Sequence, residues 1–149
     1  MFKLLHGKKG FTILELLIVI AVIAILVGIA LPRFKGMKDE GNYAKAKGEL
    51  RTLQTAVESY YLHNSSAYPT NIDGNLTGAT PQIIATSPID AFGTTIYKYF
   101  KSTNGNYYII FSVGPGGTAT ITGISDAGVL AGSAGDDIYV SNGTVQSGG

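Results

Sequence analysis

The chain has 149 residues, of which 14% are charged, and its formal net charge is +1. So small a charge produces no field that would favour nucleic acid as a partner. The absence of cysteine excludes disulfides and thiolate metal sites. The residues from 63 onward suffice for one modest hydrophobic core, whereas those before them do not have a globular pattern.

The first ten residues are short and basic, and they contain no apolar run long enough to enter a membrane. Their three lysines, Lys3, Lys8 and Lys9, favour retention on the cytoplasmic side. We interpret residues 1–10 as a leader that is removed. Its removal leaves a mildly acidic mature chain, which makes DNA binding by charge alone still less favourable.

Residues 11–31 are apolar except for Thr12 and Glu15, and as a helix they would span about 31 Å, the thickness of a bilayer core. A secretory signal peptide or an ordinary single-pass anchor would each explain the apolar composition. Neither explains a carboxylate five residues into the segment. A charged carboxylate at a membrane helix centre costs on the order of 2.5–3.5 kcal/mol, so Glu15 predicts a positively charged partner.

A cut between Gly10 and Phe11 would create that partner. The new α-amino group would lie one helical turn from Glu15, or beside the Glu15 of a neighbouring chain. In the second arrangement the ion pair also fixes the axial register between chains, because any other stagger leaves Glu15 unpaired.

Beyond the apolar segment, the sequence predicts a second, amphipathic half of the same helix, ending near residue 62. Pro32 lacks a backbone donor and predicts a kink or local melting of the helix. After it, apolar residues recur at spacings of three and four, which predicts one face laid on a sheet. These residues are Tyr43, Ala46, Leu50, Leu53, Val57 and Tyr60.

The region 63–149 is expected to form a globular head. A loop should run to about residue 87, and a short helical turn can form at 81–85. Strands are predicted at 95–101, 106–113 and 118–123, and a short strand at 137–141 closes the sheet. The fold class is therefore α+β, a long N-terminal helix packed on a small antiparallel sheet.

The residues Lys-Gly-Phe-Thr-Ile-Leu-Glu-Leu at 9–16, followed by an apolar run, resemble the processing site of type IV prepilins and type II secretion pseudopilins. The resemblance implies cleavage after Gly10 by prepilin peptidase, N-methylation of Phe11, and polymerisation through the N-terminal helices. It also implies contact between Glu15 and a neighbouring N-terminus. Pro32 is similar in position to the helix-breaking proline of that family.

The head has short motifs at 67–69, 90–93, 112–117 and 136–138 in an order similar to that of major pseudopilins. Ala91 and Phe92 depart from the Asp-Pro-Trp-Gly form usual in that group.

The pseudopilin resemblance implies a calcium ion in the loop before the Asp-Asp-Ile motif, with Asp126, Asp136 and Asp137 as its candidate ligands. Calcium takes six to eight oxygen ligands. At Gly116 and Gly117 the sequence lacks an acidic residue that the group often has, and an ordinary acidic turn before a strand is the alternative.

An enzyme is not expected. His63 is the one histidine outside the leader, and its place near a helix end favours a capping role over catalysis. The Gly-Pro-Gly-Gly stretch at 114–117 lacks the Lys-Ser/Thr ending of a phosphate loop and is interpreted as a turn.

The function that the resemblance implies is structural: a subunit of a pilus-like filament, first of all a major pseudopilin of type II protein secretion. Its expected partners are further copies of itself, prepilin peptidase, an inner-membrane assembly platform, minor pilins or pseudopilins, and membrane lipid before assembly. The precursor is expected in a bacterial inner membrane, with the head on the periplasmic or extracytoplasmic side. The alternatives are a type IV pilin for adhesion, motility or DNA uptake, a tethered binding domain that never polymerises, and a secreted enzyme with an unusual signal peptide.

Overall fold

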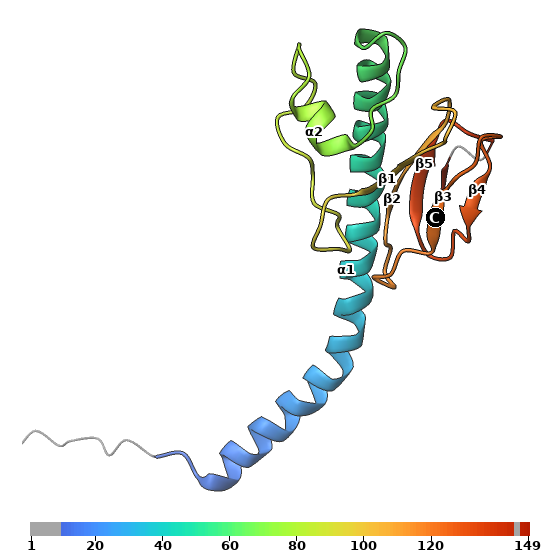
Figure 1. The fold of residues 1–149 in the computed structure, drawn as a ribbon. Coiled ribbons are helices and arrows are strands. Elements are labelled where there is room, and N and C mark those ends of the chain that lie inside the picture. Colours follow the sequence, from blue (N-terminus) through green and yellow to red (C-terminus); the bar gives the residue numbers. More distant parts are fainter. Residues whose placement is uncertain (1–9, 145–146) are drawn as a thin grey trace, which may run out of the picture. The chain divides into compact units, whose positions relative to one another are not determined.

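The computed structural model describes residues 10–144 and 147–149. Most of the predicted leader lies outside the described residues. The chain divides into two compact units, residues 1–38 and 39–149, and each is described by itself. The elements are α1 Ile13–His63, α2 Ile72–Thr77, β1 Lys98–Lys101, β2 Tyr108–Ser112, β3 Ile121–Ile124, β4 Leu130–Gly132, β5 Ile138–Ser141 and β6 Ser147–Gly148 (Figure 1).

In the first unit, the chain from Ile13 onward is one continuous stretch of α1. Of the kink or local melting expected at Pro32, the melting is wrong, because the helix continues through this residue. A proline removes one backbone hydrogen bond, and the flanking turns retain theirs.

In the second unit, the predicted apolar stripe of α1 is confirmed. Ala46, Leu50, Leu53 and Val57 are buried in one cluster with residues of the sheet, and Tyr43 and Tyr60 pack against its border. Spacings of three and four residues place these side chains on one side of a helix with 3.6 residues per turn. The helix is therefore held to the head along this face.

The main sheet has four antiparallel strands in the order β1-β2-β5-β6. Ile110 of β2 is opposite Tyr99 of β1 and Val140 of β5, and these pairs define the register of the three strands. The strand expected to close the sheet, at 137–141, is in fact interior, because β6 pairs beyond it. The strand expected at 95–101 is shorter in the structure. Strand β1 begins at Lys98, and Ile96 makes an isolated bridge to Ile89.

The third predicted strand, at 118–123, was expected in the same sheet, and this is wrong. It forms as β3 and pairs with β4 in a separate two-stranded sheet. Strand β4 was not predicted, because its Leu-Ala-Gly sequence has little β propensity.

The main sheet is covered on both faces, which explains the continuous burial of β2. Tyr108 and Ile110 belong to the cluster that contains α1, whereas Ile109 and Phe111 pack with residues of the β3–β4 pair. Successive side chains of a strand point to opposite faces, so one apolar run serves two layers. In Figure 1 the sheet lies between α1 and the β3–β4 pair.

The helical turn expected at 81–85 is also wrong, and α2 forms earlier in the same loop. Its N-cap is Asn71, whose side chain accepts a hydrogen bond from the Gly74 amide at 2.8 Å. Asn75 completes the turn by accepting from the amides of Thr70 and Asn71, each at 3.0 Å. The asparagine side chains satisfy the free amides of the first turn and so determine where this helix starts.

Candidate functional site

Glu15 and Thr12 form a reciprocal cap at the start of α1. The Glu15 Oε2 atom accepts hydrogen bonds from the backbone amide of Thr12 at 3.0 Å and from its hydroxyl at 3.1 Å. In return, the Glu15 amide donates to the Thr12 hydroxyl at 3.1 Å. This is the capping-box arrangement, and it satisfies amides that a helix start otherwise leaves free.

The cap changes the interpretation of Glu15. The carboxylate has neutral donors within its own chain and lies in the first turn, where the helix dipole favours a negative charge. Thr12 is the residue that the sequence reasoning missed, although a Thr-x-x-Glu pattern before an apolar run is the signal for a capping box. Both bonds use Oε2, so Oε1 accepts no hydrogen bond from any described residue.

The predicted processing residues, Gly10 and Phe11, lie just before the helix. Both are exposed, and the Phe11 side chain is 88% exposed. A methyl group added at Gly10 would meet no atom within 4 Å, so nothing in the described chain requires glycine there. No described residue therefore covers Gly10 or Phe11.

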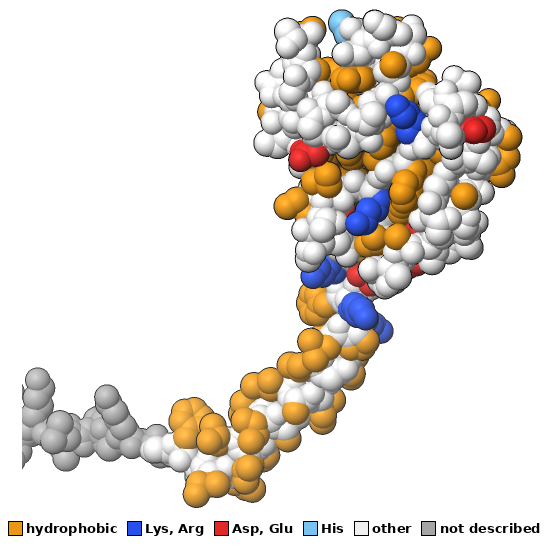
Figure 2. Space-filling view, in the orientation of Figure 1, with side chains coloured by type: hydrophobic (Ala, Val, Ile, Leu, Met, Phe, Trp, Pro, Cys, Tyr) orange, Lys and Arg blue, Asp and Glu red, His pale blue; other side chains and the backbone are white. Residues whose placement is uncertain are grey.

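The first unit exposes a continuous apolar surface. Its large side chains are exposed on every side of the helix, as Figure 2 shows for one face. They extend from Phe11 to Phe34 and Met37, which are 66% and 68% exposed. A helix that is apolar all round belongs inside a membrane or against other chains. By length and composition α1 can cross a membrane.

In the second unit, partly buried hydrogen bonds join α1 to β2 and to the residue before β1. Tyr108 donates to Glu58 Oε1 at 2.6 Å, and Tyr97 donates to Glu49 Oε2 at 2.6 Å. Burial, followed by the bond to Glu58, raises the pKa of Tyr108 well above its ordinary value. Burial and the bond to Glu49 raise the pKa of Tyr97 in the same direction. These pairs have a structural role, because the phenols stay protonated donors at neutral pH.

Asp90 connects two of the head motifs that the sequence singled out. It is buried, and it accepts a hydrogen bond from the Ser112 hydroxyl at 2.6 Å and another from the Val113 amide at 2.9 Å. The motif at 90–93 is thereby held against the end of β2. Its departure from the family form at Ala91 and Phe92 does not involve these bonds.

The three carboxylates expected to bind calcium are not gathered into one ligand set. Asp126 lies in the turn between β3 and β4, where its Oδ1 accepts from the Asn104 amide at 2.8 Å. Asp137 contacts the other end of β3, through the amide of Ile121. Among the described residues, no group of three acidic or histidine side chains lies close enough to hold a metal ion. The three carboxylates therefore do not form one ligand set, and a site built from Asp136, Asp137 and backbone carbonyls stays a prediction.

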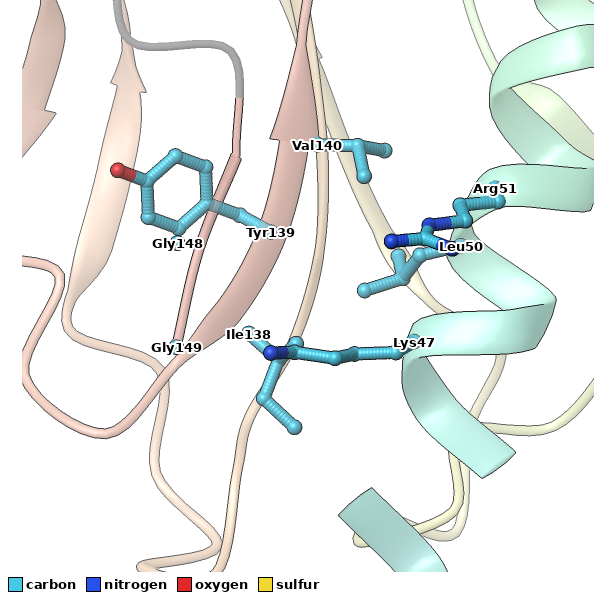
Figure 3. Close-up of a pocket in the computed structure, with 8 residues that line it drawn as sticks. All are labelled: Lys47, Leu50, Arg51, Ile138, Tyr139, Val140, Gly148 and Gly149. Atoms are coloured by element: carbon cyan, nitrogen blue, oxygen red, sulfur yellow. The ribbon is translucent and has the colours of Figure 1, made fainter. Parts of the chain in front are cut away.

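A hollow of about 220 Å³ lies between α1 and the strands β5 and β6 (Figure 3). Lys47 and Arg51 point into it from the helix, and Leu50, Ile138 and Val140 are among the residues behind them. Among the described residues that line it, no nucleophile is paired with a base, as a hydrolytic site would need. His63 is a cap, as expected: its ring nitrogen Nδ1 lies 2.8 Å from the Ser59 carbonyl oxygen.

Comparison with known proteins agrees with the N-terminal geometry. A family described as the prokaryotic N-terminal methylation motif matches residues 5–31. The type II secretion system core protein G of Klebsiella michiganensis is 36% identical over 46% of this chain and 48% of its own length, so the chain spans about half of that relative.

Two longer matches extend into the head. The core protein G of Klebsiella pneumoniae is 29% identical over 76% of this chain and 89% of its own length. A fimbrial protein of Pseudomonas aeruginosa is 28% identical over 80% of this chain and 77% of its own length. No solved structure gives a significant match. With its capped apolar helix, its methylation motif and these relatives, the chain is similar to pilins and to type II secretion pseudopilins.

Proposed function

We propose that the protein is the repeating subunit of a pilus-like filament, specifically a major pseudopilin of a type II protein secretion system. The observation that carries this proposal is the exposed apolar helix that begins at a methylation motif. The relatives named core protein G support the secretion version. The family is one of structural subunits, and the proposed function is assembly rather than catalysis.

Assembly would exchange one apolar environment for another. Before assembly, lipid covers the side chains between Phe11 and Met37. When a subunit leaves the membrane, water cannot replace lipid on so large an apolar surface, and neighbouring helices must cover it. The heads, with their own cores, then form the outer wall of the filament.

Glu15 would select the register of that assembly. Cleavage after Gly10 gives Phe11 a positively charged amine, and the free Oε1 of a neighbouring Glu15 can accept it while Oε2 keeps the cap. A charge-assisted bond of this kind is about twice as strong as a neutral one. The cap therefore holds the carboxylate in place for an intermolecular contact.

The further partners in this proposal are prepilin peptidase, an inner-membrane assembly platform and minor pseudopilins. The precursor would sit in the bacterial inner membrane with its basic leader on the cytoplasmic side and its head outside. The mature subunits would form an envelope-spanning filament.

Two variants at the cap test the role of the charge. Glu15→Gln retains the side-chain acceptor of a capping box but removes the charge, whereas Thr12→Ala retains the charge and removes the cap. We expect Glu15→Gln to be processed normally and to fail in filament formation, scored by electron microscopy and by crosslinking between subunits. Glu40→Gln, on the exposed surface of the same helix, is the control and should assemble normally. Normal filaments from Glu15→Gln would refute the pairing.

The mature N-terminus tests the processing step. Mass spectrometry should find N-methylated Phe11 as the first residue of the wild type, and an unprocessed precursor when Gly10 is replaced by a bulky residue. Cleavage near Ala30 would instead identify an ordinary signal peptide, and an intact N-terminus would identify a simple anchor. Either result would overturn the proposal.

The second candidate is a surface pilus, which the fimbrial relative favours. Deletion of the gene distinguishes the two versions. Accumulation of secreted proteins in the periplasm, without loss of surface fibres, supports the secretion system. Loss of surface fibres with normal secretion supports the pilus.

A further inference from the structure

We infer that Asp136 and Asp137 fasten the loop between β2 and β3 by direct hydrogen bonds, in the place where the family resemblance implies a calcium ion. The contacts below define this arrangement, which we call the aspartate clasp. It makes stability of the head independent of calcium. The inference rests on how the carboxylates are already used, and it does not depend on the proposed function.

Asp137 forms the buried half of the clasp. Its side chain is fully buried at the start of β5, and its Oδ2 atom accepts three hydrogen bonds. The donors are the Thr120 amide at 2.8 Å, the Thr120 hydroxyl at 2.9 Å and the Ile121 amide at 2.8 Å. One carboxylate oxygen thus satisfies the backbone where β3 begins and joins it to β5. Hydrogen bonds to a charged acceptor are the stronger kind.

Asp136 forms the exposed half. Its Oδ2 atom accepts a short hydrogen bond from the Gly116 amide, in the stretch where the resemblance leads one to expect an acidic ligand. The carboxylate can approach so closely because Gly116 has no side chain: a Cβ there would lie 2.6 Å from Asp136 Oδ2. Gly114, at φ +62°, is likewise adapted to close approach, since a Cβ would collide with the Asp136 carbonyl.

Asp126 takes no part in the clasp. Its Oδ1 accepts from the Asn104 amide and its backbone carbonyl from the Asn104 side chain at 3.0 Å. These bonds tie the β3–β4 turn to the β1–β2 turn. Asp126 is therefore committed to another contact, at the opposite end of β3 from Asp137.

One oxygen remains to be placed. Asp137 Oδ1 is buried and has no hydrogen-bond partner among the described residues. A single free carboxylate oxygen does not by itself make a calcium site, because the ion takes six to eight oxygens and backbone carbonyls or water would have to supply the others. Its cost is offset by the three bonds to Oδ2, which no neutral side chain at this position would accept as strongly.

Thermal unfolding of the mature full-length protein in detergent tests the clasp, with tyrosine fluorescence as the readout. Calcium chloride is supplied at about 5 mM, above the dissociation constants of extracellular calcium modules, which are on the order of 10⁻⁴–10⁻³ M, and compared with a chelator. We expect the same Tm in both buffers. Asp137→Asn should lower the Tm by several degrees, equally in both. Asp126→Asn retains a carbonyl acceptor for Asn104 and should leave the Tm nearly unchanged.

Two results would overturn the inference. One is a calcium-dependent rise of several degrees in the wild type that Asp137→Asn abolishes, which would restore the metal site. The other is a normal Tm for Asp137→Asn in the chelator. If that variant does not fold, Gly116→Ala takes its place: it should lower the Tm in both buffers, whereas Gly48→Ala, where the added methyl meets nothing within 4 Å, should not.

Discussion

The two units of this chain differ in whether their apolar side chains are buried within the chain. Residues 39–149 bury Leu50, Val57 and Ile110 against each other in an internal core. In the described part of residues 1–38, side chains of the same kinds, such as Leu26, stay exposed. The head therefore carries its stability within one chain, whereas the apolar segment depends on whatever surrounds it. All nine tyrosines lie within residues 39–149, so tyrosine fluorescence reports on that unit alone.

Equal substitutions in the two units should give the largest contrast. Leu50→Ala leaves a cavity in the core and should destabilise the head by about 2–5 kcal/mol. Leu26→Ala, on the exposed segment, should leave the free energy of unfolding of the head unchanged. Urea unfolding followed by tyrosine fluorescence measures both. Equal losses would mean that the units do not differ as described.

A charge introduced into the apolar segment should impair membrane insertion and leave the stability of the head unchanged. Leu26→Lys should disfavour membrane insertion by on the order of 2.5–3.5 kcal/mol, because a charge in the apolar segment has no partner. Membrane fractionation of the precursor measures insertion, and urea unfolding of the purified protein should again be unaffected. Leu62→Lys is the control and should insert normally, because Leu62 is exposed on α1 outside the apolar segment.

Loss of the helix cap should have a smaller effect. Thr12→Ala removes both the hydroxyl donor and the acceptor in the capping box and should destabilise the first turn of α1 by about 1 kcal/mol. Hydrogen exchange of the amides near Glu15, in detergent micelles, should speed up by roughly fivefold at that energy. Thr52→Ala, which removes only an exposed bond to the Gly48 carbonyl, is the matched control. Unchanged exchange would contradict the cap.

The smallest effect near neutral pH is expected from the buried phenols. Folding raises the pKa of Tyr97, Tyr99 and Tyr108, so the folded chain keeps protons that the unfolded chain loses above about pH 10. Stability from these groups is complete below pH 10 and should fall as the pH rises further. Urea midpoints at pH 8, 10 and 11 measure this, and Tyr97→Phe should reduce the slope. A flat profile would exclude the linkage.

Much of the architecture follows from local patterns. The stripe from Ala46 to Val57 predicted the face of α1 correctly, because a helical period is a strong signal over several turns. The separate β3–β4 sheet could not be predicted from local patterns. Which strands pair depends on tertiary contacts, and residues 118–132 do not alternate apolar and polar side chains in a way that identifies the partner. Asn71 starts a helix within the stretch that was expected to be a loop, and the local melting expected at Pro32 does not occur; both outcomes depend on neighbouring hydrogen bonds.

The candidate site was predictable in part. Cleavage at Gly10, methylation of Phe11 and an intermolecular role of Glu15 stay predictions, whereas the Thr-x-x-Glu pattern before the apolar run was sufficient to predict the cap at Thr12. The calcium ligands were chosen by order along the chain, and the structure separates Asp126 from Asp137 by the length of β3. Distance along a sequence does not reveal at which end of a hairpin a side chain lies.

The cap at Thr12 and Glu15 has a consequence for maturation. The residues that determine where α1 begins all lie after the cut between Gly10 and Phe11. Loss of the leader would therefore require no refolding of the first turn, because its hydrogen bonds involve no residue before Thr12. The proposed cleavage would change the electrical charge at the chain's new end and leave the backbone as it was, so the peptidase would act as a chemical switch and not as a conformational one.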